Sequence, residues 1–488
     1  MNKQLPPANP STSASQRAVF EHLLLVITFL LIFIMAARTP LDTDMWWHLS
    51  AGEEMLRSGK ILMTDVFSYT RAGALWTNPY WLSQIGMAAL FRWQGFLGLG
   101  AAVALLATAS MGLVYLQCSG PGLLKAVALL LGSIVASVVW SPRPQLVSLL
   151  LLALTAYLIY LYKWKGKDIL WGLPLVFFLW GNFHGGYPLG LILIGAALAG
   201  EVLNHILALG GETVLPWRKI IRLAVWGILG GLAVLANPNG LRMWLLPFQT
   251  VDMRVLQEFI PEWASPDFHN LLQQALLWLL LASFTAVGVS GKMIDGSDLF
   301  TLLGFAYMAF VARRNFGPFA LVAVPILCRY GAAALEAWEI RAPWLRKLAQ
   351  KGDPEEKGRA IKKMINLGLV GLLGLVALGK LYGVTQPALV NGYLEQSFPA
   401  QAVRWLNENQ PPGRLLNEYN WGGYLQWALR DYPIFVDGRT DLFNDEMVGE
   451  WIEIVQVGPG WQEMLDRYQV DLVMLEPDRP LLIELEKA

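Results

Sequence analysis

The strongest constraint on the fold of this chain is a series of long apolar runs that recurs through most of its length. A helix needs about 20 apolar residues to cross the hydrocarbon core of a bilayer. Eleven runs approach or reach that length, near residues 18–37, 95–117, 122–140, 145–162, 168–181, 186–208, 220–236, 271–290, 296–312, 316–334 and 364–383. The sequence therefore predicts a polytopic α-helical membrane protein with about eleven transmembrane helices.

The composition agrees with a membrane protein and excludes other classes. Charged residues make up 15% of the 488 residues, against about 25% in a soluble chain. Lys and Arg number 37, as do Asp and Glu, so the chain lacks the basic excess of a nucleic-acid-binding protein and no nucleic-acid partner is expected. The only cysteines, Cys118 and Cys328, exclude a disulfide framework and a cysteine-based zinc site.

Orientation is predicted from the short loops, because cytoplasmic loops carry the excess of Lys and Arg. With a cytoplasmic N-terminus, nineteen of the 37 cations fall in inner segments and ten in outer short loops, and the remaining eight follow from Lys380 onward. The first run is followed by Arg38-Thr39-Pro40 rather than a small-residue cleavage site, so we expect it to remain as an anchor. An odd number of spans then places the C-terminal segment outside the cell (inner or plasma) membrane.

Three segments are predicted to lie outside the bilayer: an outer loop at 38–94, a basic inner loop at 340–363 and a C-terminal tail. We expect two domains, a transmembrane domain at 1–384 that carries the outer loop and an extracytoplasmic α/β domain at 385–488. The inner loop is interpreted as a topological and lipid-headgroup contact.

The tail alternates between helical and extended patterns. Helices are expected at 400–407, 421–429, 446–455 and 461–468, and strands at 414–416, 433–436 and 471–475. Strands separated by helices favour a small layered α/β domain with a mostly parallel sheet. Asp437-Gly438-Arg439 follows the second strand, where such sheets bind ligands, but an ion pair of Arg439 with Asp437 or Asp441 is the preferred interpretation.

Two carboxylates follow the first apolar run directly, in the segment Asp42-Thr43-Asp44-Met45-Trp46-Trp47-His48. A helix that starts near Asp44 has an acidic N-cap, and His48 lies one turn later on the same face. A cap needs one acid, whereas a metal or phosphate site needs several converging oxygens. The presence of Asp42 beside Asp44 therefore favours a functional site over a simple cap.

The rest of the outer loop carries a family resemblance. Glu54-Met55-Leu56 and Ser58-Gly59 follow Asp44 at a characteristic spacing, and Pro79-Tyr80-Trp81-Leu82 completes the loop. Here the chain resembles the GT-C superfamily of polytopic membrane glycosyltransferases, in the branch of the lipid A aminoarabinose transferase and the bacterial relatives of protein O-mannosyltransferases. Weaker similarity is found in outer segments at 141–145, 180–186, 237–240, 262–263 and 313–315, and in the tail at 417–425 and 435–439.

The resemblance implies a membrane enzyme that transfers a sugar from a polyprenyl-phosphate donor to an acceptor hydroxyl at the outer face. Asp44 matches the catalytic Asp of the family and is expected to act as general base, with Asp42 beside it. Many relatives have Asp-Glu at this place, whereas this chain has Asp44-Met45. A divalent cation, Mg or Mn, held by Asp42 and Asp44 is therefore left open.

Further candidate residues are polar groups of the predicted outer face. The departing phosphate needs positive charge, and a guanidinium matches phosphate oxygens in a bidentate way. The predicted substrate-binding set comprises Arg143, Arg313, Arg314, His48, Asp65, Asn182, His184 and Glu262. The alternative for His48 and His184 is a hydrogen-bonded packing role. The alternative for the adjacent Arg313 and Arg314 is that their side chains extend, or snorkel, to the membrane interface.

Two other classes of function stay open. A transporter or flippase for a lipid-linked sugar needs charges buried within the spans, and these runs contain few. A non-catalytic membrane partner is the other alternative, since the Glu expected after Asp44 is missing. The chain shows no glycine-rich loop of the dinucleotide or P-loop type, which disfavours a nucleotide-sugar donor.

Overall fold

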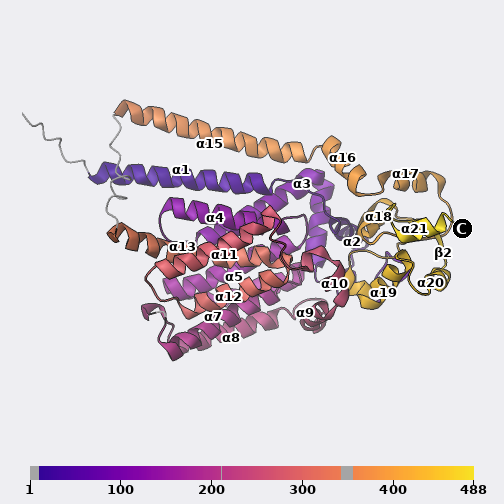
Figure 1. Ribbon diagram of the computed structural model, residues 1–488, viewed down its shortest axis with the longest axis horizontal. Helices are drawn as coiled ribbons and strands as arrows, with labels where there is room; N and C mark the ends of the chain where they lie inside the picture. Colours follow the sequence, from indigo (N-terminus) through magenta and orange to yellow (C-terminus); the bar gives the residue numbers. More distant parts are fainter. Residues whose placement is uncertain (1–9, 210, 342–355, 488) are drawn as a thin grey trace, which may run out of the picture.

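Long helices that run side by side form the body of the protein, and the C-terminal residues cover one end of that bundle (Figure 1). The computed structural model describes residues 10–209, 211–341 and 356–487. Within them, eight helices are long and apolar enough to cross a membrane. These are α1 (Pro10–Ala36), α3 (Trp81–Tyr115), α4 (Gly122–Ala136), α5 (Gln145–Lys165), α7 (Pro188–Leu207), α11 (Leu271–Val289), α13 (Phe316–Arg341) and α15 (Glu356–Val384).

The other three predicted runs also form helices. Two are shorter apolar helices, α6 (Leu173–Phe183) and α12 (Gly296–Val311). The third is α8 (Trp217–Ala233). The prediction of a polytopic helical membrane protein is thus confirmed, with eight helices of the described residues rather than eleven reaching the length and hydropathy of a full span.

Helix α3 contains a kink at Gly95 that separates an outer part from the spanning part. Gly95 has a φ of 55°, a conformation that glycine adopts without steric cost. Residues 81–94 pack against α2 (Met45–Ser58) in the outer loop. The apolar run predicted to begin at residue 95 therefore begins at a real change of direction.

Charged residues buried in the bundle occur as ion pairs at the end opposite the tail. Lys163 of α5 contacts Glu201 of α7 and lies 2.9 Å from the carboxylate of Asp295, and all three side chains are almost fully buried. Arg329 of α13 similarly pairs with Asp298 of α12. Paired charges of this kind stabilise helix contacts in a low-dielectric interior. Residues 342–355, most of the predicted inner loop, lie outside the described residues.

The tail consists of short helices around a small sheet. Strand β1 (Arg414–Asn417) pairs with β2 (Val470–Met474) in parallel. The helices are α16 (Pro387–Ser397), α17 (Ala400–Asn409), α18 (Gly422–Ala428), α19 (Thr440–Val455), α20 (Trp461–Tyr468) and α21 (Pro480–Leu485). The predicted alternation of helix and strand is present, but the sheet has two strands in the described part of the chain.

The remaining predicted strand, the second in sequence at 433–436, pairs with the outer loop instead. The backbone N–H of Ile434 donates to the carbonyl of Phe67, and that of Tyr69 donates to the carbonyl of Ile434, both at 3.1 Å. The prediction of a strand within the tail sheet was therefore wrong, because its pairing partner comes from a segment more than 360 residues away in sequence. This bridge joins the tail to the outer loop.

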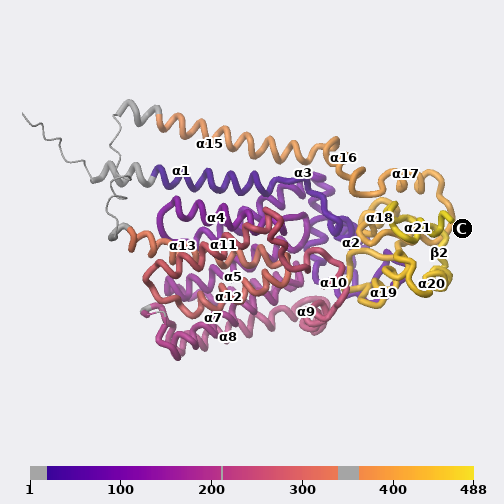
Figure 2. Tube along the Cα trace, in the orientation of Figure 1, coloured from indigo at the N-terminus to yellow at the C-terminus, as the bar shows by residue number. Residues whose placement is uncertain are grey.

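A buried cluster of ion pairs also connects the tail to the outer loop. Arg439 of the tail lies 2.7 Å from both Asp437 and Asp65, and the exposed fraction of all three side chains is 1% or less. The expected pairing of Arg439 with Asp437 is present, whereas Asp441 accepts a hydrogen bond from Trp76 Nε1 at 3.3 Å. The tail is thus placed firmly against α2 and the loop that follows it (Figure 2).

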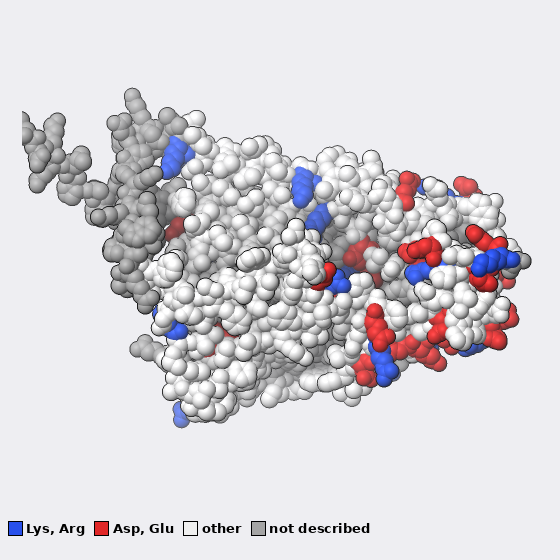
Figure 3. All heavy atoms as spheres, in the orientation of Figure 1, with Lys and Arg blue, Asp and Glu red and all other residues white. Residues whose placement is uncertain are grey.

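The surface of the molecule divides in the same way as the fold. Charged side chains gather on the tail, whereas most of the bundle surface in this view is uncharged (Figure 3). An uncharged, apolar belt with charge at the ends is the surface expected for a protein embedded in a bilayer.

Candidate functional site

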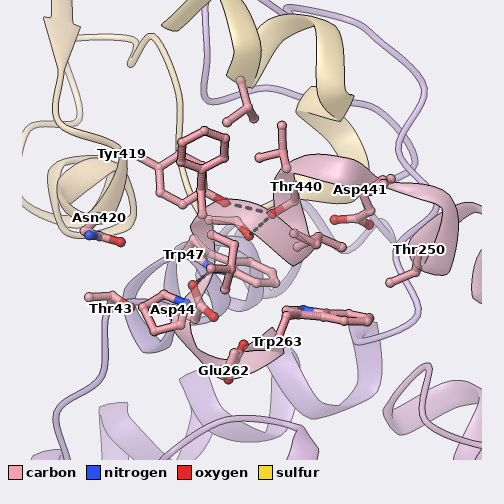
Figure 4. Close-up of a pocket in the computed structure, with 18 of the residues that line it drawn as sticks. Thr43, Asp44, Trp47, Thr250, Glu262, Trp263, Tyr419, Asn420, Thr440 and Asp441 are labelled. Carbon is pink, nitrogen blue, oxygen red and sulfur yellow. Dashed lines mark hydrogen bonds between the residues drawn. The ribbon is translucent and has the colours of Figure 1, made fainter. Parts of the chain in front are cut away.

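A cavity of about 700 Å³ lies where the outer loops of the bundle meet the tail. One part of its wall comes from residues at the start of α2 and from the loops before α5 and α13, and another from the tail. Figure 4 shows Asp44, Glu262 and Trp263 at the lower edge of this cavity, with Tyr419, Thr440 and Asp441 above them. Segments from distant parts of the sequence therefore enclose one chamber at the end of the bundle.

Arg143 stands at the centre of the charged wall. Its guanidinium lies 2.7 Å from Asp44, 2.8 Å from Glu262 and 3.3 Å from Asp42. The Pro residues on either side restrict the backbone of Ser141-Pro142-Arg143-Pro144, and the Ser141 hydroxyl accepts a hydrogen bond from Arg143 Nε at 3.1 Å. One cation thereby connects three carboxylates from two segments, the start of α2 and the loop at Glu262, to the segment before α5.

Asp44 occupies the N-cap position of α2, but its carboxylate does not cap the helix. One oxygen accepts a hydrogen bond from Trp47 Nε1 at 3.1 Å and the other accepts one from Arg143. Asp42 Oδ1 instead accepts the backbone N–H of Asp44 at 2.9 Å. The capping interpretation of Asp44 is therefore replaced by one in which Asp42 orients the backbone and Asp44 faces the cavity.

The tail comes into direct contact with Asp44 through a glycine. A Cβ placed on Gly438 would lie 2.3 Å from Asp44 Oδ1 and 3.3 Å from Trp47 Nε1. The Asp437-Gly438-Arg439 turn approaches the Asp44 carboxylate this closely because its middle residue is glycine, since a Cβ at that position would force the carboxylate or the turn to move.

The electrostatics of the site favour a proton-exchanging role for Asp44. Burial raises the pKa of Asp44 to about 6, Arg143 offsets part of that effect, and the neighbouring Asp42 and Glu262 add to it. For Glu262 burial also raises the pKa, but Arg143 and Arg314 outweigh burial and hold its pKa below the usual value. Two neighbouring carboxyl groups are thus driven apart in acidity, a pattern found at acid–base sites.

The structure brings seven of the ten predicted site residues to the cavity wall. These are Asp42, Asp44, His48, Arg143, His184, Glu262 and Arg314. The other three lie outside it. Asp65 is bound to Arg439 and Ser68, Asn182 connects Trp81 to the carbonyl of Ala236, and Arg313 is held by its backbone N–H on the carbonyl of Ala264.

Several cavity residues were not identified from the sequence. Tyr80, Trp263, Tyr419, Thr440 and Asp441 line the chamber. The segments named for the family resemblance contained Tyr80, Trp263 and Tyr419, and the segment at 435–439 adjoined Thr440, but nothing in the sequence indicated that the tail reaches Asp44. Burial raises the pKa of Asp441 to about 6, which makes it a second titratable carboxyl on the opposite wall.

The carboxylates as arranged do not fit a divalent cation. The oxygens of Asp42, Asp44 and Glu262 converge on the guanidinium of Arg143, which occupies the position that a cation would need. Among the residues that the structure describes, no group of three or more His, Cys, Asp or Glu has the arrangement of a metal site. A cation at Asp42 and Asp44 would require Arg143 to withdraw.

Comparison with known proteins gives a clear result only at the level of structure. No protein-family model and no curated protein matches the sequence. The archaeal oligosaccharyltransferase AglB from Archaeoglobus fulgidus, solved with an inhibitory peptide and a dolichol-phosphate, aligns with a TM-score of 0.57 and 12% identity over 92% of this chain and 69% of that chain. The apo form of the Archaeoglobus fulgidus enzyme aligns with a TM-score of 0.52 and 11% identity over the same shares.

A third solved structure covers nearly the full length of both chains. ArnT from Cupriavidus metallidurans in the apo state aligns with a TM-score of 0.50 and 14% identity over 98% of this chain and 95% of that chain. AglB and ArnT are both GT-C superfamily polytopic membrane glycosyltransferases. The chain therefore has the GT-C fold, as the resemblance of its outer loop led us to expect.

Proposed function

We propose that this protein is a glycosyltransferase that moves a sugar from a polyprenyl-phosphate donor to an acceptor hydroxyl at the outer face of the cell membrane. The observation that carries the proposal is the position of Asp44, whose carboxylate faces a cavity of about 700 Å³ at the end of a bundle with the GT-C fold. Burial raises the pKa of this carboxylate. Support also comes from AglB, which has the same fold and was solved with a dolichol-phosphate.

Arg314 is the best candidate for the donor phosphate. Arg143 is occupied by three carboxylates, and Arg313 lies off the cavity. The guanidinium of Arg314 stacks on Trp263 at 4.4 Å and, in the described part of the chain, makes no side-chain hydrogen bond or ion pair. Its donors are therefore free to bind phosphate oxygens in a bidentate way.

An apolar wall provides a place for the lipid part of the donor. Helices α9 (Arg242–Asp252) and α10 (Arg254–Phe259) supply apolar lining residues such as Leu246 and Leu256. The other side of α9 exposes large apolar side chains, including Leu245 and Phe248. An amphipathic helix of this kind lies in the bilayer interface, so an isoprenoid chain can pass from the membrane along α9 into the cavity.

The tail would then supply the acceptor side. Tyr419, Thr440 and Asp441 present hydroxyl and carboxyl groups to the cavity opposite Arg314 and Asp44. An acceptor hydroxyl bound between these walls can reach Asp44 as the general base. As the new C–O bond forms, Asp44 takes the hydroxyl proton and the bond between the sugar carbon and the phosphate oxygen breaks. The phosphate leaves with that electron pair and is stabilised by Arg314.

The experiment that tests this function is a sugar-transfer assay with the full chain in lipid nanodiscs. Undecaprenyl-phosphate sugars serve as donors, and release of undecaprenyl phosphate is measured. Asp44→Asn keeps a hydrogen-bond acceptor for Trp47 but removes the base, and we expect the rate to fall about 10²–10⁴-fold. Glu54→Gln, further along the same helix and outside the cavity, is the matched control. Unchanged transfer by a folded Asp44→Asn protein would refute the assigned role.

A further inference from the structure

Two histidines and a tyrosine form a group on one wall of the cavity. The ring of Tyr80 lies 5.2 Å from the ring of His48 and 5.4 Å from that of His184, between centroids. All three residues line the cavity, and the exposed fractions of the two histidines are 3% and 9%. The protonation of these rings can be derived from their hydrogen-bond partners.

His184 carries its proton on Nε2. The backbone N–H of Gly186 donates to His184 Nδ1 at 2.9 Å, and a backbone N–H can only donate. The Ser148 hydroxyl lies 2.7 Å from the same nitrogen and itself accepts a hydrogen bond from Trp180 Nε1 at 2.6 Å. Nδ1 is therefore an acceptor without a proton, and in the neutral ring the proton resides on Nε2.

His48 is fixed in the same form by a chain of three hydrogen bonds. The backbone N–H of Tyr80 donates to Asn78 Oδ1 at 3.1 Å, which orients the Asn78 amide. Asn78 Nδ2 then donates to Gln84 Oε1 at 2.7 Å, which orients the Gln84 amide. Gln84 Nε2 is left to donate to His48 Nδ1 at 3.3 Å. His48 Nδ1 is thus also an acceptor, and its proton is on Nε2.

The surroundings keep both rings neutral. Burial lowers the pKa of His184 to about 3, with Arg314 and Arg143 acting in the same direction and Glu262 against them. Burial likewise lowers the pKa of His48 well below its usual value, with help from Arg143 and His184. Neither histidine is able to act as general base, because Nδ1 already accepts hydrogen bonds and Nε2 holds a proton.

The donors of this group have no hydrogen-bond partner among the described residues. In the part of the chain that the structure describes, neither Nε2 group nor the Tyr80 hydroxyl forms a hydrogen bond with another residue. Three uncharged donors are therefore available on the same cavity wall as the guanidinium of Arg314. Because their residues line the cavity, these donors are available to bind the oxygens of a ligand.

We propose that His48, Tyr80 and His184 form an uncharged hydrogen-bonding site for the phosphate oxygens of a lipid phosphodiester, next to the charge supplied by Arg314. The proposal rests on the proposed function, since it assigns the donor phosphate to this wall. A phosphodiester carries one negative charge, so one free guanidinium balances it and neutral donors complete its coordination. Binding of the donor phosphate at this site therefore does not require a protonated, positively charged histidine.

The chain offers variants that remove one donor at a time. Asn at position 48 or 184 keeps an acceptor oxygen near the Nδ1 position for Gln84 or Gly186 but lacks the Nε2–H group. Tyr80→Phe removes a hydroxyl that forms no hydrogen bond with any residue in the described ranges. His269→Asn changes an exposed histidine away from the cavity and is the matched control.

The first measurement is the affinity of the full chain in nanodiscs for citronellyl methyl phosphate, a short isoprenyl phosphodiester. We expect His48→Asn, His184→Asn and Tyr80→Phe each to weaken binding about tenfold, the usual effect of losing a hydrogen bond to a charged group. His269→Asn is expected to bind as the unmodified chain does. Unchanged affinity in all three cavity variants, or equal affinity for inorganic phosphate, overturns the proposal.

The second measurement tests the neutral state. The histidine variants should bind the phosphodiester more weakly at every pH, and the shape of the plot of affinity against pH should stay the same. The groups that titrate near pH 6 are the carboxyls of Asp44 and Asp441, not the imidazoles. ¹⁵N spectra of histidine-labelled protein should show unprotonated Nδ1 and protonated Nε2 for the two signals lost in the variants. A flatter curve in the variants would reveal imidazolium and overturn the proposal. If the unmodified chain binds the phosphodiester with the expected dependence on the three donors but transfers no sugar, only the proposed function is contradicted.

Discussion

Arg143 Nη1 lies 2.7 Å from Asp44 Oδ2, and this contact joins the segment before α5 to the start of α2. The same guanidinium binds Glu262 of the loop that precedes α11. Three outer loops are therefore held together by one side chain, which is 17% exposed. Arg143 organises the site, whereas Arg314, which stacks on Trp263 but makes no side-chain hydrogen bond or ion pair with another described residue, is left for the ligand.

Replacing Arg143 is expected to lower the stability of the folded protein as well as its activity. Arg143→Gln leaves three partly buried carboxylates without their counter-charge, and the loss of one partner from such a pair costs about 3 kcal/mol or more. We expect a clear drop in thermal stability in detergent. Arg92→Gln is the matched control, since Arg92 forms an exposed pair with Glu53, and should leave stability unchanged. Equal unfolding temperatures for the two variants would show that Arg143 is not an organising residue.

The pH dependence of transfer should report the ionisation of Asp44. Because burial raises its pKa to about 6, the base is ionised above that pH and protonated below it, so kcat/KM should fall about tenfold per unit on the acid side. Glu262 raises the pKa of Asp44, so Glu262→Gln should lower it and move the acid limb to lower pH.

The control for this shift is a second carboxyl that also titrates near the same pH. Asp441 lines the cavity but is not among the groups that perturb Asp44, so Asp441→Asn should leave the position of the acid limb unchanged. A limb that moves with Asp441→Asn and not with Glu262→Gln would assign the base to Asp441 and refute Asp44. The measurement is kcat/KM over about pH 4.5 to 8.5.

Much of the fold and part of the site could be predicted from the sequence, for identifiable reasons. The apolar character of each span can be read from its own residues, and helices are present at all eleven predicted runs. The position of Asp44, Arg143 and Glu262 at one end of the bundle follows from counting the spans between them. Their mutual contact does not, because it depends on how three loops fold over the end of the bundle.

The tail shows where sequence reasoning failed. Its two strands were recognised from local patterns, but residue 434 pairs with Ser68, a long-range contact that no local pattern contains. Asp65 was predicted to bind substrate because it is acidic and lies in the outer loop, and Arg439 binds it instead. Tyr80 was noted only within the Pro79-Tyr80-Trp81-Leu82 element of the outer loop, because nothing in that element indicates that its side chain reaches the cavity.

Gly438 offers a test of the contact between the tail and Asp44. In Gly438→Ala the new methyl group would lie 2.3 Å from Asp44 Oδ1, so the carboxylate or the turn has to move. We expect transfer to fall at least tenfold, since small displacements of a catalytic group have effects of about that size or larger. The thermal stability should fall only modestly, because the carboxylate can rotate.

Gly449→Ala is the matched control for Gly438→Ala. Gly449 lies within α19, and a Cβ there meets no atom within 4 Å. Alanine should stabilise the helix by about 1 kcal/mol or less and leave transfer unchanged. The contact would have no functional role if Gly438→Ala transferred sugar as fast as Gly449→Ala.

The orientation in the membrane is tested most directly by cysteine labelling. Cys328 is fully buried, so Cys118→Ala provides a background of low reactivity. If the tail is extracytoplasmic, a membrane-impermeant maleimide should label Asn409→Cys on intact spheroplasts of an expression host, because residue 409 is exposed at the end of α17. Lys167→Cys, exposed at the opposite end of the bundle, should react only after the membrane is permeabilised. The reverse pattern would place the cavity in the cytoplasm and exclude donor binding from the outer leaflet.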